Sequence, residues 1–258
     1  MTTPNEPPLL EIEDVSMAFG GLMALHKVSF HVHSQQIKAI IGPNGAGKTT
    51  LFNLVTGIYQ PASGDIRLRG ASIRGLKPHV IARRGIARTF QTIRLFEGMT
   101  VLENVMLGQQ VHTSTGFLDA ALRLPQARRE ETTLRAKAMA LLERVGLNEK
   151  AHEPASSLPF GLQRTLEIAR ALATEPVLLV LDEPASGLNA SESRVLAALI
   201  RTIREEGTAV VLIEHDMDLV MGLVDEVLVL VYGTVLAEGP PAAIQQNPQV
   251  IAAYLGTE

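Results

Sequence analysis

The sequence has no cysteine, no long apolar run and no excess of positive charge. Without cysteine no disulfide framework can form. No segment approaches the roughly 18 consecutive apolar residues of a membrane-spanning helix, so none is expected. A net charge of −4 with a pI near 6.0 gives no overall basic face, so no nucleic-acid partner is expected.

The N-terminus also lacks a targeting signal. Met1 to Pro8 is polar and proline-rich, without the basic-then-apolar pattern of a signal peptide, which favours a cytosolic protein. A length of 258 residues with 46% hydrophobic content predicts one large α/β domain with a subdomain.

The most informative stretch is a glycine-rich loop between an apolar run, Ile37 to Ile41, and the apolar start of a predicted helix. It reads Gly42, Pro43, Asn44, Gly45, Ala46, Gly47, Lys48, Thr49 and Thr50. Its glycines let the backbone aim successive N–H groups at one concavity, and the following helix N-terminus adds partial positive charge. Lys48 would reach the β- and γ-phosphates of a nucleotide, and the Thr49 hydroxyl would complete a Mg²⁺ shell. The alternative, a plain turn between strand and helix, does not need the lysine and threonine.

The chain before this loop predicts antiparallel strands. Apolar residues alternate with polar ones around Leu10 to Ile12 and Val28 to Val32, and a Gly20-Gly21 turn separates the two segments. Phe19 lies just before that turn. Its ring could stack on an adenine or pack in the core, and the sequence leaves both open.

Helical periodicity dominates from Thr100 to about Leu172, which predicts an inserted helical subdomain at about 92–172 of a single domain that spans 1–258. Thr100 and Glu103 have the spacing of a capping box, and a later apolar helix face ends before Gly146. Gly108 to Pro125 is weakly patterned and is expected to be loop and short helix.

The α/β pattern returns at Val177 to Leu181, an apolar run typical of a parallel strand buried on both faces. Asp182 and Glu183 follow it, at the strand end where open α/β sheets bind ligands. His215 follows a later strand, Ala209 to Ile213. Asp182 would hold the Mg²⁺ shell, Glu183 would take a proton from the attacking water, and His215 would hold the γ-phosphate and that water. For the carboxylates, the alternative role is a helix cap.

Together these features resemble the ATP-binding subunits of ABC transporters. In the family's order, Phe19 matches the adenine-stacking aromatic, and Gly42 to Thr49 matches the phosphate loop. Gln91 matches the glutamine loop, which senses nucleotide at the metal site and faces the membrane subunit. Asp182 and Glu183 match the second Walker sequence, and His215 matches the switch histidine. The remaining matches are the dimer-interface loop Ser186 to Asn189 and the nucleotide-binding signature Leu158 to Gln163, with Pro159, Phe160, Gly161 and Gln163.

The resemblance implies an α/β P-loop NTPase with a mostly parallel core sheet, an N-terminal antiparallel β subdomain and a helical insert. It also implies a Mg²⁺-dependent ATPase. Within the family, the resemblance is closest to the branched-chain amino acid importers. It rests on Arg88 to Gln91, Arg94 to Phe96, Met99 to Asn104, Ile213 to Met217 and Ala253 to Gly256. The stretch Gly108 to Arg135 looks like the longer of the two ATPase subunits in those systems.

Such importers imply partners and a location. These are a second ABC ATPase subunit, either a shorter paralogue or another copy of this chain, two transmembrane permease subunits and, indirectly, a periplasmic solute-binding protein. The chain would lie at the cytoplasmic face of the inner membrane. Relatives of the group also import urea, amides and aromatic acids, so the expected cargo is a branched-chain amino acid or a related small solute.

The signature departs from the usual Leu-Ser-Gly-Gly-Gln, because Pro159 replaces the hydroxyl or small residue. Two other functions were weighed. A non-transport ABC ATPase of translation or DNA repair is disfavoured by the single cassette and the lack of a heptad pattern. A P-loop kinase or GTPase is disfavoured by the signature, and a GTPase also by the lack of an Asn-Lys-x-Asp sequence.

Overall fold

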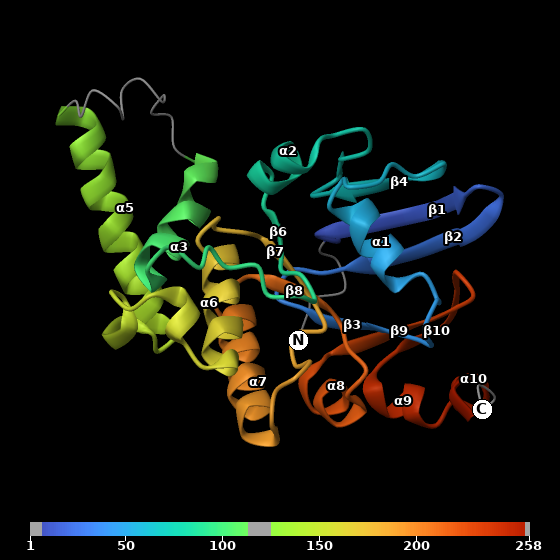
Figure 1. Ribbon diagram of the computed structural model, residues 1–258. Helices are drawn as coiled ribbons and strands as arrows, with labels where there is room; N and C mark the ends of the chain where they lie inside the picture. Colours follow the sequence, from blue (N-terminus) through green and yellow to red (C-terminus); the bar gives the residue numbers. More distant parts are fainter. Residues whose placement is uncertain (1–6, 113–124, 256–258) are drawn as a thin grey trace. The chain divides into compact units, whose positions relative to one another are not determined.

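The computed structural model describes residues 7–112 and 125–255 and leaves 1–6, 113–124 and 256–258 undescribed (Figure 1). The chain forms two compact units: Met1–Gln91 together with Val177–Glu258, and Thr92–Pro176. In the described part of the chain, no helix combines the length and the hydrophobicity needed to cross a bilayer.

The first unit contains a small antiparallel sheet, as the alternating pattern predicts. Its strands are β1 (Leu10–Phe19), β2 (Leu22–Val32), β4 (Ser63–Leu68) and β5 (Ala71–Ser72), in the order β2-β1-β4-β5. Gly20 and Gly21 form the β1–β2 turn with positive φ, which glycine adopts without strain.

The second sheet of this unit is mostly parallel. Its strands are β3 (Ile37–Ile41), β6 (Ile86–Arg88), β7 (Leu178–Asp182), β8 (Ala209–Ile213), β9 (Glu226–Val231) and β10 (Thr234–Gly239), in the order β10-β9-β3-β8-β7-β6. Only β10 pairs antiparallel. Every residue of β3, β7 and β8 is buried, which explains why these strands are apolar except for Lys38 in β3 and Asp182 at the end of β7. Because these three strands are parallel, the residues that follow them lie at one edge of the sheet.

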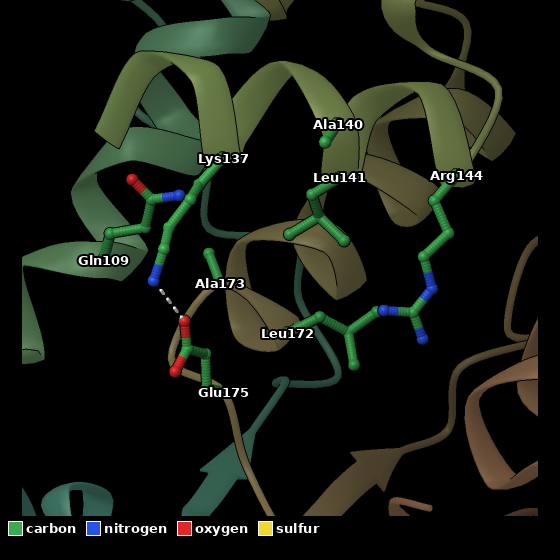
Figure 2. Close-up of a pocket in the computed structure, with 8 residues that line it drawn as sticks. All are labelled: Gln109, Lys137, Ala140, Leu141, Arg144, Leu172, Ala173 and Glu175. Carbon is green, nitrogen blue, oxygen red and sulfur yellow. Dashed lines mark hydrogen bonds and ion pairs between the residues drawn. The ribbon is translucent and has the colours of Figure 1, made fainter. Parts of the chain in front are cut away.

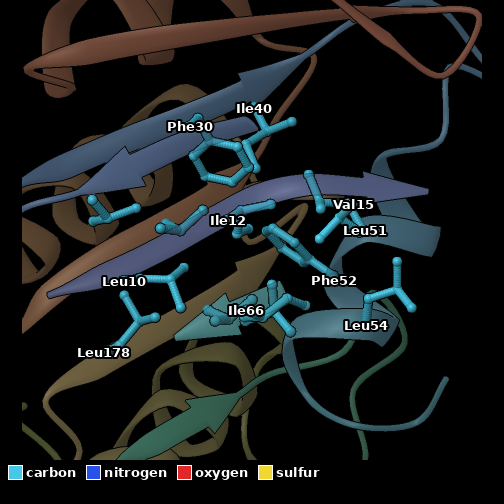
Figure 3. Packing of buried hydrophobic residues seen from close by; sticks show 14 of the residues in the cluster. Leu10, Ile12, Val15, Phe30, Ile40, Leu51, Phe52, Leu54, Ile66 and Leu178 are labelled. Atoms are coloured by element: carbon cyan, nitrogen blue, oxygen red, sulfur yellow. The ribbon is translucent and has the colours of Figure 1, made fainter. Parts of the chain in front are cut away.

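Helices cover this sheet and complete the core. They are α1 (Lys48–Val55), α2 (Pro78–Arg83), α7 (Ala190–Glu205), α8 (Met217–Leu223), α9 (Pro241–Gln245) and α10 (Pro248–Leu255). Phe52 and Leu51 of α1 pack in one cluster with Ile12 and Phe30 of the first sheet and Ile40 of the second (Figure 3). The core therefore fixes α1, and with it the loop before α1, against both sheets.

The second unit is helical. Its elements are α3 (Val101–Gln109), the 3₁₀ turn η1 (Gln110–His112), α5 (Pro125–Arg144), the 3₁₀ turns η2 (Asn148–Lys150) and η3 (Ala155–Ser157), and α6 (Phe160–Leu172). The predicted capping box is confirmed: Glu103 N donates to Thr100 Oγ1 over 3.2 Å, and Thr100 N donates to Glu103 Oε2 over 2.8 Å.

One prediction for this unit is tested only in part. The stretch Gly108 to Pro125, expected to be loop and short helix, begins inside α3 and continues as the turn η1, and its residues 113–124 lie outside the described part. The glycine has a packing reason, because a Cβ at Gly108 would lie 2.2 Å from the carbonyl oxygen of Arg170 in α6. Gly108 lets α3 and α6 approach closely, so here a helix tolerates a weak helix former.

A buried cation joins three strands of the mostly parallel sheet, β3, β9 and β10. The Lys38 side chain in β3 is 1% exposed and pairs with Glu226 (2.9 Å) and Glu238. We expect Lys38→Met to lower the free energy of unfolding by about 3 kcal/mol, because two carboxylates lose their cation. Lys150→Met, at an exposed pair with Glu153, should cost less than about 0.5 kcal/mol. Urea unfolding measures both variants. If Lys38→Met and Lys150→Met lower the free energy of unfolding equally, the buried ion pairs of Lys38 do not stabilise the fold.

Candidate nucleotide-binding site

The loop between β3 and α1 is built on close backbone contacts. Gly42, Gly45 and Gly47 have φ values of 152°, 79° and 101°. A Cβ at Gly42 would lie 2.0 Å from the Leu230 carbonyl oxygen, and one at Gly47 would lie 2.7 Å from the Ala24 carbonyl oxygen. Gly47 is the N-cap of α1 and offers no side chain to the first-turn N–H groups. These donors and the helix dipole form a concavity suited to phosphate.

Lys48 lies in this loop and faces two carboxylates. Its Nζ donates to the carbonyl oxygens of Gly42 (2.7 Å) and Pro43 (2.9 Å). Burial lowers the pKa of Lys48, while Glu183 and Asp182 oppose that shift through their negative charge. The structure thus brings the phosphate-loop cation together with both acidic residues predicted from the sequence.

Glu183 lies next to two other predicted residues, Gln91 and His215. Gln91 Nε2 donates to Glu183 Oε2 over 2.8 Å, and His215 Nδ1 lies 3.9 Å from the same oxygen, beyond hydrogen-bonding distance. Glu183 has a positive φ of 45°, a strained conformation for this residue type that is concentrated at functional sites. The His215 side chain is 70% exposed, so it is accessible from solvent.

Arg88 is a component of the site to which the sequence analysis gave no role. Its side chain is 6% exposed, and Nη2 donates to Asp182 Oδ2 over 2.8 Å. Nη1 donates to Asn53 Oδ1 of α1 over 2.7 Å, and the guanidinium lies between the rings of Phe52 and Phe90. In the sequence, Arg88 stood out only as the first residue of the stretch Arg88 to Gln91 and as a charged residue that ends the short strand β6, and neither feature indicates its partners.

Glu214 is a second residue whose role the sequence did not indicate. It is 2% exposed and accepts hydrogen bonds from the backbone N–H groups of Ala185 (2.7 Å) and His215 (3.1 Å). Burial raises its pKa, and these bonds oppose the shift only in part. Glu214 therefore ties the loop after Glu183 to the residue that carries the predicted switch imidazole.

Phe19 lies on the surface at the end of β1. Its side chain is 41% exposed and packs edge-on against Tyr59, with ring centroids 5.2 Å apart. The alternative that Phe19 belongs to the core is wrong, and an exposed ring face suits stacking on a base. In the loop itself, Asn44, Gly45 and Thr49 are exposed.

The signature residues lie in the helical unit. Pro159 is the N-cap of α6, so the helix begins at Phe160. Gln163 Nε2 donates to the Leu158 carbonyl oxygen over 2.9 Å, and Phe160 is 47% exposed. No side-chain oxygen caps this helix start, which leaves backbone donors near Gly161.

The same unit has a pocket of ≈ 310 Å³ between α5 and the end of α6 (Figure 2). An ion pair between Lys137 and Glu175 spans it at 2.9 Å. It is lined by Gln109, Lys137, Ala140, Leu141, Arg144, Leu172, Ala173 and Glu175. None of these is a predicted site residue, so the pocket is separate from the signature.

The side chains near the phosphate loop suit a Mg²⁺ ion that is bound by only a few protein ligands. Among the described residues, no three His, Cys, Asp or Glu side chains cluster as a metal cage. Mg²⁺ prefers one or two protein ligands together with water and phosphate oxygens. Asp182, whose Oδ2 is engaged by Arg88, and the exposed Thr49 hydroxyl fit that mode of binding.

The ion pair between Arg88 and Asp182 predicts a large stability effect. We expect Arg88→Met to lower the free energy of unfolding by about 3–5 kcal/mol, because it leaves a buried carboxylate without a cation. The double variant Arg88→Met/Asp182→Asn should lose less free energy of unfolding than Arg88→Met, since it leaves no buried charge unpaired. Arg67→Met, at an exposed pair with Glu13, is the control and should cost less than about 1 kcal/mol. Urea unfolding measures all three. An Arg88→Met chain as stable as the control would contradict this role.

The raised pKa of Glu214 predicts a pH dependence. A carboxyl with a higher pKa in the folded state stabilises the fold most below its unfolded pKa of about 4.3, and that contribution is lost as the pH rises through the folded pKa. The stability of wild type relative to Glu214→Gln should therefore fall between pH 4 and neutral pH. Glu205→Gln, an exposed change in α7, should show no such trend. If the free energy of unfolding of wild type rises relative to that of Glu214→Gln as the pH increases, the raised pKa of Glu214 is contradicted.

Comparison with known proteins identifies the family. Residues 25–186 match the family model for ABC transporters, and residues 234–258 match that for branched-chain amino acid ATP-binding cassette transporters. The chain is 49% identical over 250 residues to the high-affinity branched-chain amino acid transport ATP-binding protein BraF of Pseudomonas aeruginosa, covering 96% of this chain and 98% of BraF. It is 48% identical to LivG of Escherichia coli with the same coverage.

Solved structures agree with these matches. A nucleotide-free ATP-binding cassette from an ABC transporter is 30% identical and superposes with a TM-score of 0.84, over 96% of this chain and 99% of that one. The ADP conformation of an ABC transporter cassette gives 0.85 at 30% identity, over 97% and 100%. The predicted fold and ATPase class are confirmed, and neither a P-loop kinase nor a GTPase fits. The chain belongs to the ABC transporter ATPases, in the group of the branched-chain amino acid transport ATP-binding proteins.

Proposed function

We propose that this chain binds ATP with Mg²⁺ and hydrolyses it to drive uptake of branched-chain amino acids or closely related small solutes. The observation that carries the proposal is the convergence of Lys48, Asp182, Glu183, Gln91 and His215 in one unit. The cargo rests on the names of BraF and LivG, which match nearly the whole chain.

Nucleotide binding is assigned to the phosphate loop and its neighbours. Phe19 stacks on the adenine, and the loop N–H groups with Lys48 hold the phosphates. Lys48 Nζ already lies on the loop, and a phosphate there would offset the burial that lowers its pKa. Thr49, Asp182 and Gln91 hold Mg²⁺, which supplies charge neutralisation for phosphoryl transfer.

Hydrolysis is assigned to Glu183 as general base. The Gln91 amide donates to Glu183 Oε2 and so orients the carboxylate. His215 lies near enough to contact the water or the γ-phosphate after a small movement of its exposed side chain. Glu214 fixes the backbone of His215, and through Ala185 it fixes the loop that follows Glu183.

The signature acts on a second ATPase subunit, either a shorter paralogue or another copy of this chain. With Pro159 as N-cap, the start of α6 presents backbone N–H groups and its positive dipole end to the partner's γ-phosphate. Phe160, Gly161 and Gln163 line that helix start. Only the serine hydroxyl of the usual signature is lost.

Two permease subunits dock on the chain at the cytoplasmic face of the inner membrane, and a periplasmic binding protein delivers the cargo to them. In the helical unit, the segment after Gln91 offers Phe96, which is 53% exposed. Leu95 packs against that unit's core and is unsuited to direct contact.

Uptake of radiolabelled leucine by cells that lack this chain tests the function. Wild type should restore ATP-dependent uptake, and unlabelled isoleucine and valine should compete with it. Lys48→Ala should not restore it. If urea or amides compete and the branched-chain amino acids do not, the transporter assignment stands and the cargo is wrong. Wild-type uptake in cells that lack the chain would refute the role in import.

Glu183→Gln separates binding from hydrolysis. We expect ATP affinity within about twofold of wild type and turnover reduced at least roughly 100-fold, because the base is lost while the cations remain. Lys48→Ala should instead weaken ATP binding by about 1.5–3 kcal/mol, since it removes a charge-assisted contact. Fluorescence titration and steady-state phosphate release measure the two effects. Normal turnover by Glu183→Gln would rule out Glu183 as the base.

The signature has its own pair of variants. Gly161→Asp should abolish nucleotide-driven pairing and transport, because a carboxylate would repel the partner's phosphate in a poorly hydrated interface. Pro159→Ser should change turnover by less than about tenfold, since the helix start rather than a hydroxyl holds the phosphate. Both are measured in the reconstituted transporter. Wild-type ATPase activity and uptake with Gly161→Asp would mean that this signature is silent.

A further inference from the structure

Arg88 connects the helix after the phosphate loop to the acidic end of β7. Its Nη2 donates to Asp182 Oδ2 over 2.8 Å. Its Nη1 donates to two side chains of the α1 segment, Asn53 Oδ1 over 2.7 Å and Thr56 Oγ1 over 3.4 Å. The Arg88 and Asp182 side chains are 6% and 7% exposed, so water does little to weaken these contacts. One buried guanidinium therefore holds α1 and the end of β7 together.

The face of α1 that Arg88 contacts also carries Thr49. Thr49, Asn53 and Thr56 are spaced by four and three positions, which places them on one side of a helix. Asp182, at the other end of the link, keeps one oxygen available, because the hydrogen bonds of the described residues engage its Oδ2 and not its Oδ1. Thr49 and Asp182 are two of the residues assigned above to Mg²⁺. Arg88 thus joins the helix face and the carboxylate that must approach the ion together.

The guanidinium has little freedom to reorient. Its central carbon lies 5.6 Å from the ring centroid of Phe52 and 5.2 Å from that of Phe90. Its donors form a rigid planar fork, which a lysine ammonium of the same charge lacks. Among the described residues, its Nε has no hydrogen-bond partner. An unpaired buried donor lowers stability, so stability alone does not account for an arginine at this position.

We propose that Arg88 is a positioning residue for Mg²⁺, which holds Asp182 and the Thr49 face of α1 at the separation that the ion requires. The proposal rests on the function proposed above, which assigns the nucleotide and the metal. Mg²⁺ demands near-ideal octahedral geometry, so displaced ligands weaken its binding. Lys48 donates to the loop carbonyls and not to a partner of Arg88. Loss of the guanidinium fork should therefore weaken the part of ATP binding that depends on Mg²⁺ and spare the rest.

Arg88→Lys tests this, because it keeps a cation beside Asp182 and removes the planar fork. Titration with a fluorescent ATP analogue, in EDTA or with increasing Mg²⁺, separates the two parts of binding. We expect affinity in EDTA to stay within about twofold of wild type, while the Mg²⁺ concentration for half-maximal strengthening rises about tenfold. Asn53→Ala, which leaves the ion pair intact, should raise that concentration about threefold. Arg67→Lys, at an exposed pair with Glu13, is the matched control and should change neither value.

Two results would overturn the role of Arg88 and leave the proposed function intact. One is a wild-type dependence on Mg²⁺ in both Arg88→Lys and Asn53→Ala. The other is an equal loss of ATP affinity with and without Mg²⁺ together with a lower unfolding temperature, which would mean that Arg88 only stabilises the fold. If wild type binds ATP equally well with and without Mg²⁺, the metal site and this inference fail while the nucleotide site stands. If wild type does not bind ATP, the proposed function fails and this inference fails with it.

Discussion

The rest of this structure depends on one steric constraint, the close approach of neighbouring backbone to the phosphate loop. Leu230 and Ala24 come so near to Gly42 and Gly47 that no side chain fits at either position. The loop is consequently held in a conformation that points its N–H groups together before any nucleotide binds. Preorganised donors of this kind give their full electrostatic effect without reorganisation.

Charge is distributed around that loop in partly desolvated groups. Burial lowers the pKa of Lys48 and raises that of Glu214, so both are held in environments that disfavour their charge. Asp182 is balanced by Arg88 within the buried strand ends. In such surroundings, added phosphate and metal charges interact more strongly than they would in water. Glu183, whose backbone is strained, lies in the same region. Backbone strain lowers stability and is concentrated at functional sites.

The parts predicted from sequence are those that depend on local pattern. The phosphate loop, the buried strands β7 and β8 and the capping box of α3 each lie within a few residues of chain, so periodicity and spacing reveal them. The proximity of Glu183 to Lys48 followed from one further rule, that parallel strands bring their carboxyl ends to one edge.

The contacts that sequence reasoning missed all join distant segments. Arg88 meets Asp182 across 94 positions, and Glu214 meets Ala185 across 29. No local pattern encodes such a partner. The glycine at position 108 of α3 has an explanation of the same kind, since only the neighbouring backbone of α6 shows why a side chain does not fit there.

The most direct test of the site is a crystal structure of the Glu183→Gln chain with ATP and Mg²⁺. Lys48 Nζ should leave the carbonyl oxygens of Gly42 and Pro43 for the β- and γ-phosphates, and the Phe19 ring should lie parallel to the adenine. Asp182 and Thr49 should contact the metal shell. A nucleotide bound elsewhere, or a Lys48 that still donates to the two carbonyls with ATP present, would contradict the assignment.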